Sequence, residues 1–364
     1  MTLVVKLGSS IVAADDGSLR TDVLDSVCAQ VSTLEKGGER VVMVTSGAIA
    51  RGMRLLDLGE RPRAMDELQA TSALGQGDLF RSYESRLSKN GVRSAQVLLT
   101  LADISSRAHY VNARQTIQRL LDWGVVPIVN ENDTTATDEI TFGDNDFLAA
   151  QLAVLIDASL LVLLTNIDGL FTANPGLVPT ARLIPEVSDT QQLERDRIGE
   201  ETSVFGTGGM GRKVAAAEIA SQSGVPTVIC NGTAPGTLVE AAEGLNVGTR
   251  FKPHPTEMPA FKLWLKYAKR STGNVYVDAG AAERLQFGGS SLLAVGITDL
   301  DGSFHAGDAV DVREGETENL IGRGISNFSA RELLPLVGMQ SVKIRELFAH
   351  ADDEVIHRDR FVLL

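Results

Sequence analysis

Carboxylates and asparagines crowd one short stretch of the chain, residues 130–146, which holds six Asp or Glu and three Asn side chains. The stretch follows an apolar run, residues 125–129, that predicts a fully buried strand. In an open α/β sheet, ligands bind where loops leave the carboxyl ends of the strands. A solvated acidic loop is the simpler interpretation, because exposed loops are usually polar. The alternation of Asn and Asp with Thr and Gly, and the apolar helix expected over residues 147–153, favour a binding site.

Three glycine-bearing loops fall at the ends of predicted strands or the start of a predicted helix, at residues 6–10, 45–50 and 206–213. Backbone N–H groups freed at such turns bind anions, and a lysine adds a full positive charge. The third loop has the glycine spacing of a P-loop, but it carries Arg212 where that motif requires lysine and lacks the Ser or Thr that binds magnesium. The loops therefore leave phosphate binding and ordinary turn chemistry as equal alternatives.

The residue types also favour a carboxylate over a hydroxyl as the group that such a site would phosphorylate. Phosphorylating a hydroxyl usually needs a general base, whereas a carboxylate with a free pKa of about 4.3 is already ionised at neutral pH. Lysines, backbone N–H groups and magnesium would then suffice, because phosphoryl transfer needs mainly positioning and charge neutralisation. No histidine lies beside the loops, which suits a carboxylate acceptor and an acyl phosphate product. The five histidines have no metal-ligand spacing, so no metal site of the protein itself is predicted.

The elements that must position these loops alternate along the first 250 residues or so. Short β-branched runs and helical stretches follow one another, which is typical of βαβ units and a mostly parallel sheet. Helices are expected at residues 21–36 and 214–222. The predicted strands are residues 3–7, 40–45, 94–100, 125–129, 160–164 and 227–230.

A second, smaller domain is expected after three prolines within residues 253–259. A short basic helix follows at residues 261–267, and then short strands with frequent glycine turns, typical of a small β-barrel. These strands are predicted at residues 274–278, 291–297 and 309–312. The predicted organisation is a domain at residues 1–258, a linker at residues 259–273 and a β domain with a C-terminal tail at residues 274–364.

Composition excludes several classes of protein. With 43% apolar and 22% charged residues, the 364-residue chain is an ordinary globular protein, and its net charge of -13 argues against nucleic acid or an anionic membrane as a partner. From residue 273 onward, 8 Lys and Arg face 15 Asp and Glu, a net charge of -7. Only Cys28 and Cys230 occur, each in an apolar segment, which indicates reduced thiols in a cytoplasmic protein. The most apolar window, residues 147–164, carries Gln151 and Asp157 and predicts a buried helix and strand rather than a membrane span.

Six segments of the first domain keep a common order and spacing: residues 5–10 (Val-Lys-Leu-Gly-Ser-Ser), 45–50 (Thr-Ser-Gly-Ala-Ile-Ala), 129–133 (Val-Asn-Glu-Asn-Asp), 142–146 (Phe-Gly-Asp-Asn-Asp), 164–170 (Leu-Thr-Asn-Ile-Asp-Gly-Leu) and 206–210 (Gly-Thr-Gly-Gly-Met). Taken together, these segments resemble the glutamate 5-kinase family, whose members have the amino-acid-kinase fold. The later segments at residues 277–281, 289–293 and 296–297 resemble the PUA barrel found in many members. The resemblance implies an α/β fold with a mostly parallel sheet sandwiched by helices, followed by a PUA-like β-barrel.

The resemblance implies ATP-dependent phosphorylation of the γ-carboxylate of L-glutamate to L-glutamyl 5-phosphate, the first step of proline biosynthesis. Two alternatives stay open: a kinase of the same fold acting on N-acetylglutamate or aspartate, and an RNA-binding PUA protein, which the charge disfavours. The resemblance further implies feedback inhibition by proline, a homo-oligomer, and the next reductase of the pathway as a possible partner.

Residue by residue, the resemblance assigns catalysis to Lys6, Lys213 and Asp146, with Asp146 organising the lysines and a Mg²⁺ ion that the nucleotide carries. Two departures from the family pattern are Asn166, where Asp is common, and Gly211-Arg212, where Ser-Thr is usual. The residues implied to bind glutamate are Ser46, Gly47, Asn130, Asp133 and Asn145. The residues implied to bind ATP are Lys6, Gly8, Ser9, Thr165, Asn166, Thr207, Gly208, Gly209, Met210, Gly211, Arg212 and Lys213.

Overall fold

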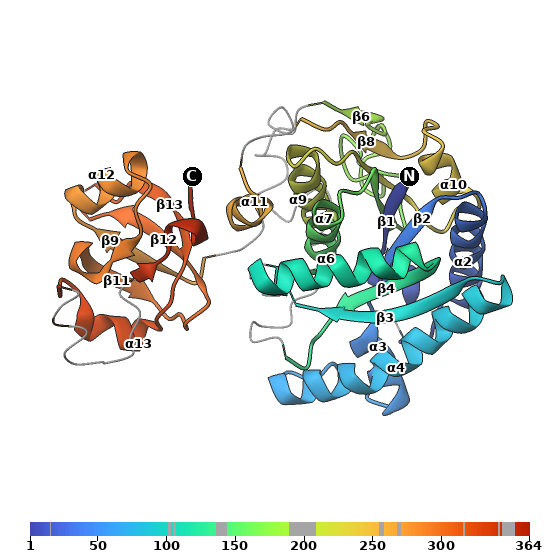
Figure 1. Cartoon of the computed structure of the whole chain (residues 1–364), viewed down its shortest axis with the longest axis horizontal. Helices are drawn as coiled ribbons and strands as arrows, with labels where there is room; N and C mark the ends of the chain where they lie inside the picture. The colour runs from blue at the N-terminus through green and yellow to red at the C-terminus, as the bar shows by residue number, and fades with distance from the viewer. Residues whose placement is uncertain are drawn as a thin grey trace. The chain divides into compact units, whose positions relative to one another are not determined.

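The chain divides into two compact units, Met1–Glu257 and Met258–Leu364, in a computed structural model (Figure 1). Each unit has its own sheet and its own hydrophobic core. The residues that the structure describes are 1–14, 16–100, 103–104, 107–135, 144–188, 209–254, 258–267, 271–315, 317–340, 343 and 354–364.

An eight-stranded sheet runs through the first unit in the order β3-β4-β2-β1-β5-β7-β8-β6. All neighbouring strands are parallel except β7 and β8, which are antiparallel, so the predicted mostly parallel sheet is confirmed. The six predicted strands are all present, whereas the very short β6 and β8 were not predicted. The strands are β1 (Thr2–Leu7), β2 (Arg40–Val44), β3 (Arg93–Leu99), β4 (Val125–Glu131), β5 (Leu160–Thr165), β6 (Glu186–Val187), β7 (Thr227–Asn231) and β8 (Thr249–Phe251).

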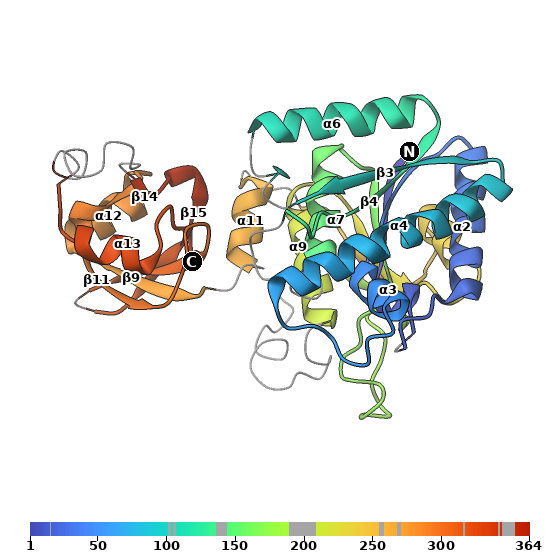
Figure 2. The ribbon, with the colours of Figure 1, turned by 90° about the horizontal axis from the view of Figure 1, so that it is seen from below.

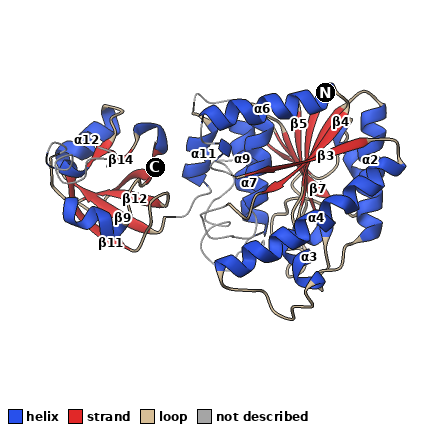
Figure 3. Cartoon of the chain, turned by 60° about the horizontal axis from the view of Figure 1, so that its bottom comes forward, coloured by secondary structure: helices blue, strands red, loops and turns tan. Residues whose placement is uncertain are grey.

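Helices cover both faces of this sheet (Figure 3). Helices α2, α4 and α10 share a core with alternate residues of β1, and α6, α7 and α9 pack on the other side. The predicted helix at residues 21–36 is confirmed as α2, and the one at residues 214–222 lies within α9. The helices are α1 (Ser9–Val12), α2 (Thr21–Lys36), α3 (Ala48–Leu55), α4 (Met65–Lys89), α6 (Arg107–Asp122), α7 (Asp144–Leu155), α9 (Gly209–Gln222) and α10 (Thr237–Ala242).

Helices α3 and α4 approach each other unusually closely (Figure 2). A Cβ atom at Gly52 of α3 would lie 1.9 Å from the carbonyl oxygen of Thr71, and one at Gly75 of α4 would lie 1.9 Å from that of Ala48. Only glycine permits this contact at either position. The contact fixes the middle of α4 beside the beginning of α3.

The second unit contains a five-stranded sheet in the order β11-β9-β12-β13-β15 and a separate β10–β14 pair. The expected small β domain is therefore present, and α11 occupies much of the predicted linker; the predicted boundaries at 258 and 273 stay predictions. Its strands are β9 (Gly273–Val277), β10 (Leu292–Leu293), β11 (Ile297–Gly302), β12 (Ala309–Glu314), β13 (Leu320–Ile325), β14 (Glu354–Ile356) and β15 (Phe361–Leu363). Its helices are α11 (Ala260–Tyr267), α12 (Ala279–Phe287) and α13 (Ala330–Leu333), with 3-10 turns η2 (Ala294–Gly296), η3 (Leu334–Leu336) and η4 (Arg358–Arg360).

One predicted strand of this unit is wrong over most of its length. Of residues 291–297, only β10 is extended before the chain enters the turn η2, and β11 begins at Ile297. A Cβ atom at Gly296 would lie 2.6 Å from Cβ of Ala281, so the turn packs closely on α12. Tertiary packing here overrides the local β-branched pattern.

The described part of the chain contains no helix that is both long enough and apolar enough to cross a membrane.

Candidate active site

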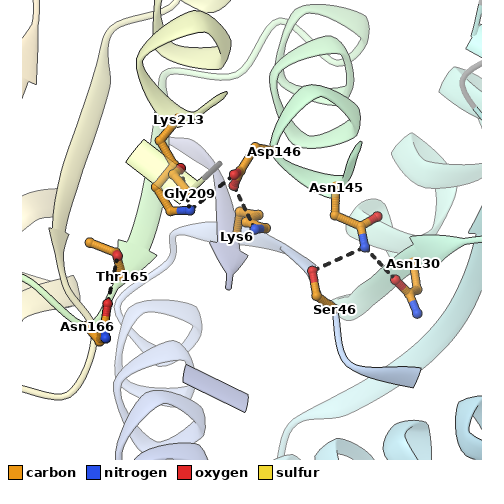
Figure 4. Close-up of polar contacts among 9 residues, drawn as sticks. All are labelled: Lys6, Ser46, Asn130, Asn145, Asp146, Thr165, Asn166, Gly209 and Lys213. Atoms are coloured by element: carbon orange, nitrogen blue, oxygen red, sulfur yellow. Dashed lines mark hydrogen bonds and ion pairs between the residues drawn. The ribbon is translucent and has the colours of Figure 1, made fainter. Parts of the chain in front are cut away.

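Three charged side chains meet near the carboxyl edge of the first sheet (Figure 4). Lys6 Nζ lies 2.6 Å from Asp146 Oδ1, and Lys213 Nζ lies 3.1 Å from Asp146 Oδ2. The exposed fractions of Lys6, Asp146 and Lys213 are 2%, 1% and 8%. Each carboxylate oxygen therefore holds one lysine, and two cations against one anion leave the buried cluster with a net positive charge.

Strand alternation and two helix beginnings bring this cluster together. Alternate residues of β1 belong to the core beneath α2 and α4, so Lys6 points to the opposite face, where α7 packs. Asp146 lies in the first turn of α7, where the helix dipole favours a carboxylate. Lys213 lies in the second turn of α9, which packs against α7, and also donates to the carbonyl oxygen of Gly209 at 3.3 Å.

The charges of the cluster determine one another's protonation. Burial lowers the pKa of Lys6 below its ordinary value; the neighbouring Asp146 opposes this change, and the charge of Lys213 adds to it. Burial by itself would raise the pKa of Asp146, but the two lysines outweigh it and hold that pKa below its ordinary value. Asp146 is therefore an ionised counter-charge at neutral pH.

A chain of neutral hydrogen bonds lies beside the charged cluster (Figure 4). Asn145 Nδ2 donates to Ser46 Oγ at 3.2 Å and to Asn130 Oδ1 at 3.0 Å. Asn130 Nδ2 in turn donates to Gln76 Oε1 at 2.6 Å. Asn145 Oδ1 is buried and accepts no hydrogen bond from any residue that the structure describes. A buried acceptor left in this way costs about 1–3 kcal/mol, which is recovered if a ligand donates to it.

A buried carboxylate lies at the far end of this half of the site. Asp133 is 9% exposed and accepts a short hydrogen bond from Ser72 Oγ of α4. Burial raises the pKa of Asp133 above its ordinary value, although the Ser72 hydrogen bond and the charge of Arg61 oppose the rise. Because burial disfavours the ionised form of this carboxylate, a cationic ligand group beside it would be stabilised.

The site residues follow the order of the strands across the sheet. Asn130 is in β4, and Ser46 lies just beyond the end of β2. Lys6 is in β1, and Thr165 is the last residue of β5. These strands are neighbours in the order β4-β2-β1-β5, and neighbouring strands lie about 4.8 Å apart, so the outer two are separated by roughly 14 Å. Figure 4 shows the same succession, with Asn130 and Thr165 on opposite sides of Lys6.

Of the glycine turns predicted to approach a phosphate, the one at Gly8 lies next to the cluster. Gly47 precedes α3 with a φ of 101°, a left-handed conformation that favours glycine. Gly8 is buried, and a Cβ atom there would lie 3.9 Å from Lys6 Nζ; its N–H donates to the carbonyl oxygen of Leu164 at 3.3 Å. Ser9 begins α1, and the first N–H groups of a helix have no acceptor within it.

The predicted nucleotide residues are divided between β5 and α9. Thr165 Oγ1 donates to Asn166 Oδ1 at 3.4 Å, and Asn166 is exposed. Gly209, Met210, Gly211 and Arg212 form the first turn of α9, with Met210 buried and Arg212 half-buried. Thr207 and Gly208 lie outside the described residues.

Sequence reasoning missed three residues near the site: Arg61, Ser72 and Gln76. The latter two are one turn apart on α4 and therefore point in the same direction, toward Asp133 and Asn130. The only local signal was two polar side chains spaced by four on a mostly polar helix. That spacing is equally typical of a solvated helix face.

No group of three or more His, Cys, Asp or Glu side chains that could hold a metal ion occurs among the described residues. Asp146 has both oxygens occupied by lysines. In this structure Asp146 is therefore engaged by the two ammonium groups.

Comparisons with known proteins agree with this fold. A family described as "Amino acid kinase family" matches residues 1–231, and one described as "PUA domain" matches residues 273–348. A protein named glutamate 5-kinase from Burkholderia multivorans is 43% identical over 363 residues, covering 100% of this chain and 97% of the relative. The glutamate 5-kinase of Geobacter sulfurreducens is 42% identical over 364 residues, with the same coverage.

A solved structure also shares the fold. The UMP kinase of Bacillus anthracis superposes with a TM-score of 0.50 at 18% identity, over 69% of this chain and 96% of its own. At that identity the likeness concerns the fold alone. The mostly parallel sheet with helices on both faces, together with the family match over residues 1–231, defines an amino acid kinase. Within that class, the chain belongs to the glutamate 5-kinase family, and the resemblance found in the sequence is confirmed.

Proposed function

We propose that this protein transfers the γ-phosphoryl group of ATP to the γ-carboxylate of L-glutamate, giving L-glutamyl 5-phosphate and ADP, the first step of proline biosynthesis. The observation that carries the proposal is the pair of buried lysines held on the two oxygens of Asp146. Full-length relatives named glutamate 5-kinase support the choice of substrate.

The reaction requires one bond to form and one to break. An oxygen of the substrate carboxylate attacks the γ-phosphorus, and the bond from that phosphorus to the bridging oxygen of ADP breaks. No proton has to be removed from the acceptor, because a carboxylate with a pKa of about 4.3 is ionised at neutral pH. The absence of a histidine from the described cluster is compatible with this chemistry.

Lys6 and Lys213 supply the charge that the transition state needs. Phosphoryl transfer spreads negative charge over the equatorial and bridging oxygens, and positioned cations stabilise it. Asp146 keeps both ammonium groups at fixed distances before the substrates arrive. The cluster is therefore preorganised, and little rearrangement is needed during the reaction.

The glutamate would lie on the β4–β2 side of the cluster. Its ammonium group has only donors, and the free acceptor Asn145 Oδ1 and the carboxylate of Asp133 suit it. Ser46, Gly47 and Asn130 would contact the remainder of the substrate. The γ-carboxylate would then point along the sheet toward Lys6.

The nucleotide would lie on the β5 side, against Thr165, Asn166, Gly8, Ser9 and the loop at residues 207–213. We propose that Mg²⁺ comes with the phosphates and neutralises part of their charge, with Asp146 keeping the neighbouring lysines in place. Asn166, where Asp is common in the family, would offer a neutral side chain to the nucleotide.

The experiment that tests the proposal is an assay of ADP release with purified protein and Mg-ATP, run separately with glutamate, N-acetylglutamate and aspartate. We expect turnover with glutamate and little with the others. N-acetylglutamate lacks the ammonium that Asp133 would bind, and aspartate is one methylene shorter. If N-acetylglutamate or aspartate were turned over in preference to glutamate, that acid would be the substrate. Lys213→Ala should lower whichever activity is seen by roughly 10²- to 10³-fold.

RNA binding is tested separately by a filter-binding titration at low salt. Residues 273–364, which make up most of the second unit, carry a net charge of -7, which disfavours binding to phosphates. We expect no retention of RNA at micromolar protein.

Three further properties are proposed on family grounds. Proline would inhibit the enzyme, which adding proline to the same assay tests, and the protein would form a homo-oligomer, which light scattering tests. The acyl phosphate product would pass to the next reductase of the pathway. We also propose a cytoplasmic location, with which the two free and buried cysteines agree.

A further inference from the structure

The hydrogen bonds of the substrate side form a chain with a single direction. Asn145 Nδ2 donates to Asn130 Oδ1 at 3.0 Å, and Asn130 Nδ2 donates to Gln76 Oε1 at 2.6 Å. The side chains come from α7, β4 and α4, so no local sequence pattern aligns them. In each link an amide nitrogen donates to the next amide oxygen.

The direction of the chain decides which atom of Asn145 remains for a ligand. A carboxamide has an acceptor at one end and donors at the other. Because Gln76 offers its oxygen, Asn130 turns its nitrogen toward α4 and its oxygen toward Asn145. Asn145 therefore uses its nitrogen within the protein and keeps Oδ1 free. A chain running the other way would leave the nitrogen of Asn145 instead, which repels an ammonium group.

Gln76 is well placed to fix this direction because the backbone just before it is packed against the beginning of α3. Its neighbour Gly75 packs against Ala48 so closely that a Cβ atom would lie 1.9 Å from the carbonyl oxygen of Ala48. Ala48 begins α3, two residues after Ser46, which also accepts from Asn145. Strand alternation turns Asn130 toward α4, since Val126 and Ile128 of the same strand belong to the core on that face.

We infer that Gln76 is a positioning residue that sets the direction of this amide chain, so that Asn145 presents a carbonyl oxygen to the ammonium group of the substrate. The inference rests on the proposed function, because it takes an α-amino acid as the ligand. Gln76 touches no reacting atom in this account. It acts through Asn130 and Asn145, and its substitution should affect substrate affinity rather than turnover.

The test compares two substitutions of similar size at the same position. Gln76→Glu keeps acceptor oxygens facing Asn130, whereas Gln76→Met removes the acceptor. We expect Gln76→Met to raise the KM for glutamate about tenfold, as loss of one ligand hydrogen bond does, with kcat and the KM for ATP within about twofold. Gln76→Glu should keep a KM for glutamate much closer to that of the wild type. An equal increase in the KM for glutamate in both variants, or no increase in Gln76→Met, would overturn the inference.

Matched controls separate positioning from general damage. Gln115 is exposed on α6, so Gln115→Met and Gln115→Glu make the same changes away from the site and should leave all constants unchanged. Thermal unfolding of the Gln76 variants reports any loss of fold, and a Gln76→Met protein that loses kcat and ATP affinity together would indicate a merely structural role and contradict the inference. If the wild-type protein fails to phosphorylate glutamate, the proposed function falls and the inference with it. If the wild-type protein phosphorylates glutamate but the KM for glutamate is not higher in Gln76→Met than in Gln76→Glu, only the inference is overturned.

Discussion

The two halves of the site differ in whether their polar groups are already paired before a ligand binds. The phosphoryl-transfer half is a closed ionic cluster in which each charge of Lys6, Asp146 and Lys213 already has a partner. The substrate half consists of hydrogen-bonded amides and the buried carboxylate of Asp133, and it leaves a buried acceptor on Asn145 open. One half is complete before any ligand binds, and the other is completed by the ligand.

This difference follows from what each half has to do. Charge that develops only in the transition state is best met by cations fixed in advance, because no reorganisation then occurs during the reaction. Selection of a substrate is sharper when polar groups remain unsatisfied without the correct ligand. We therefore expect substitutions in the ionic half to lower kcat, and substitutions in the amide half to raise KM.

The largest effect is expected from Asp146→Asn, which leaves two lysines buried without a counter-charge. We expect kcat to fall about 10³-fold and the free energy of unfolding at neutral pH to fall by about 3–5 kcal/mol. The folded pKa of Asp146 lies below its ordinary value, so its stabilising contribution is present above that ordinary value and is lost as pH falls through the folded pKa. Steady-state kinetics and urea unfolding measure the two quantities.

A matched control for Asp146→Asn is Asp78→Asn. Asp78 pairs with Arg51 at 2.5 Å in a more exposed setting, with 29% and 21% of the side chains accessible. Such a pair contributes less than about 1 kcal/mol. If both variants lose the same stability, the buried cluster has no special role.

The next largest effect is expected from Lys6→Ala and Lys213→Ala. Each removes a cation that stabilises the transition state, so kcat should fall by roughly 10²- to 10³-fold, about 3 to 4 kcal/mol, with a smaller change in the KM for glutamate. The assay is run at saturating ATP and glutamate, with Lys36→Ala at the exposed end of α2 as the control. A folded variant with near-wild-type turnover would remove that lysine from the mechanism.

In the other half, Asp133→Ala should mainly raise the KM for glutamate. The contact with the substrate ammonium exists in both the ground state and the transition state, so its loss weakens binding with little change in kcat. We expect an increase of about tenfold or more. Initial rates over a range of glutamate concentrations decide the matter, and an unchanged KM would place the ammonium elsewhere.

The smallest expected effect is the pH dependence that Asp133 gives to glutamate binding and to stability. Burial raises the pKa of Asp133, so this carboxylate takes up a proton at a higher pH than an ordinary aspartate, and glutamate binding should weaken as pH falls through that raised value. The stability of the free enzyme changes with pH in the opposite direction. Folding disfavours the ionised form of Asp133, so the free energy of unfolding of Asp133→Asn should be at least as large as that of the wild type, and the difference should grow as pH rises. Binding and thermal unfolding from pH 5 to pH 8 test both signs, and parallel pH profiles for the two proteins would contradict them.

Much of the fold could be predicted because it depends on local patterns. The helix at residues 21–36 and the buried strands of the first sheet follow from apolar periodicity and glycine turns, and both were found as predicted. The predicted strand at residues 291–297 was wrong because close packing of Gly296 on α12 turns the chain there. The strands β6 and β8 are too short to carry a periodic signal.

The candidate site was predictable only where its residues belong to recognisable loops. Lys6, Asp146 and Lys213 lie in such loops or helix beginnings, and the structure brings them within ion-pair distance. Gln76 and Ser72 were missed because their partners lie 54 and 61 residues away in the sequence. A polar residue on a helix gives no indication of a contact at that separation.

The amino-acid sequence by itself determined which segments become strands and which loops carry charge, since these depend on neighbours a few residues apart. Only the tertiary structure decided that β4, β2, β1 and β5 lie side by side in that order, and so that a chain of amides, a lysine pair and a hydroxyl follow one another across the sheet edge. The reason is that strand order and helix packing arise from burial of apolar surface over the whole domain. The direction of the amide chain, from Asn145 to Gln76, is a property of that packing as well.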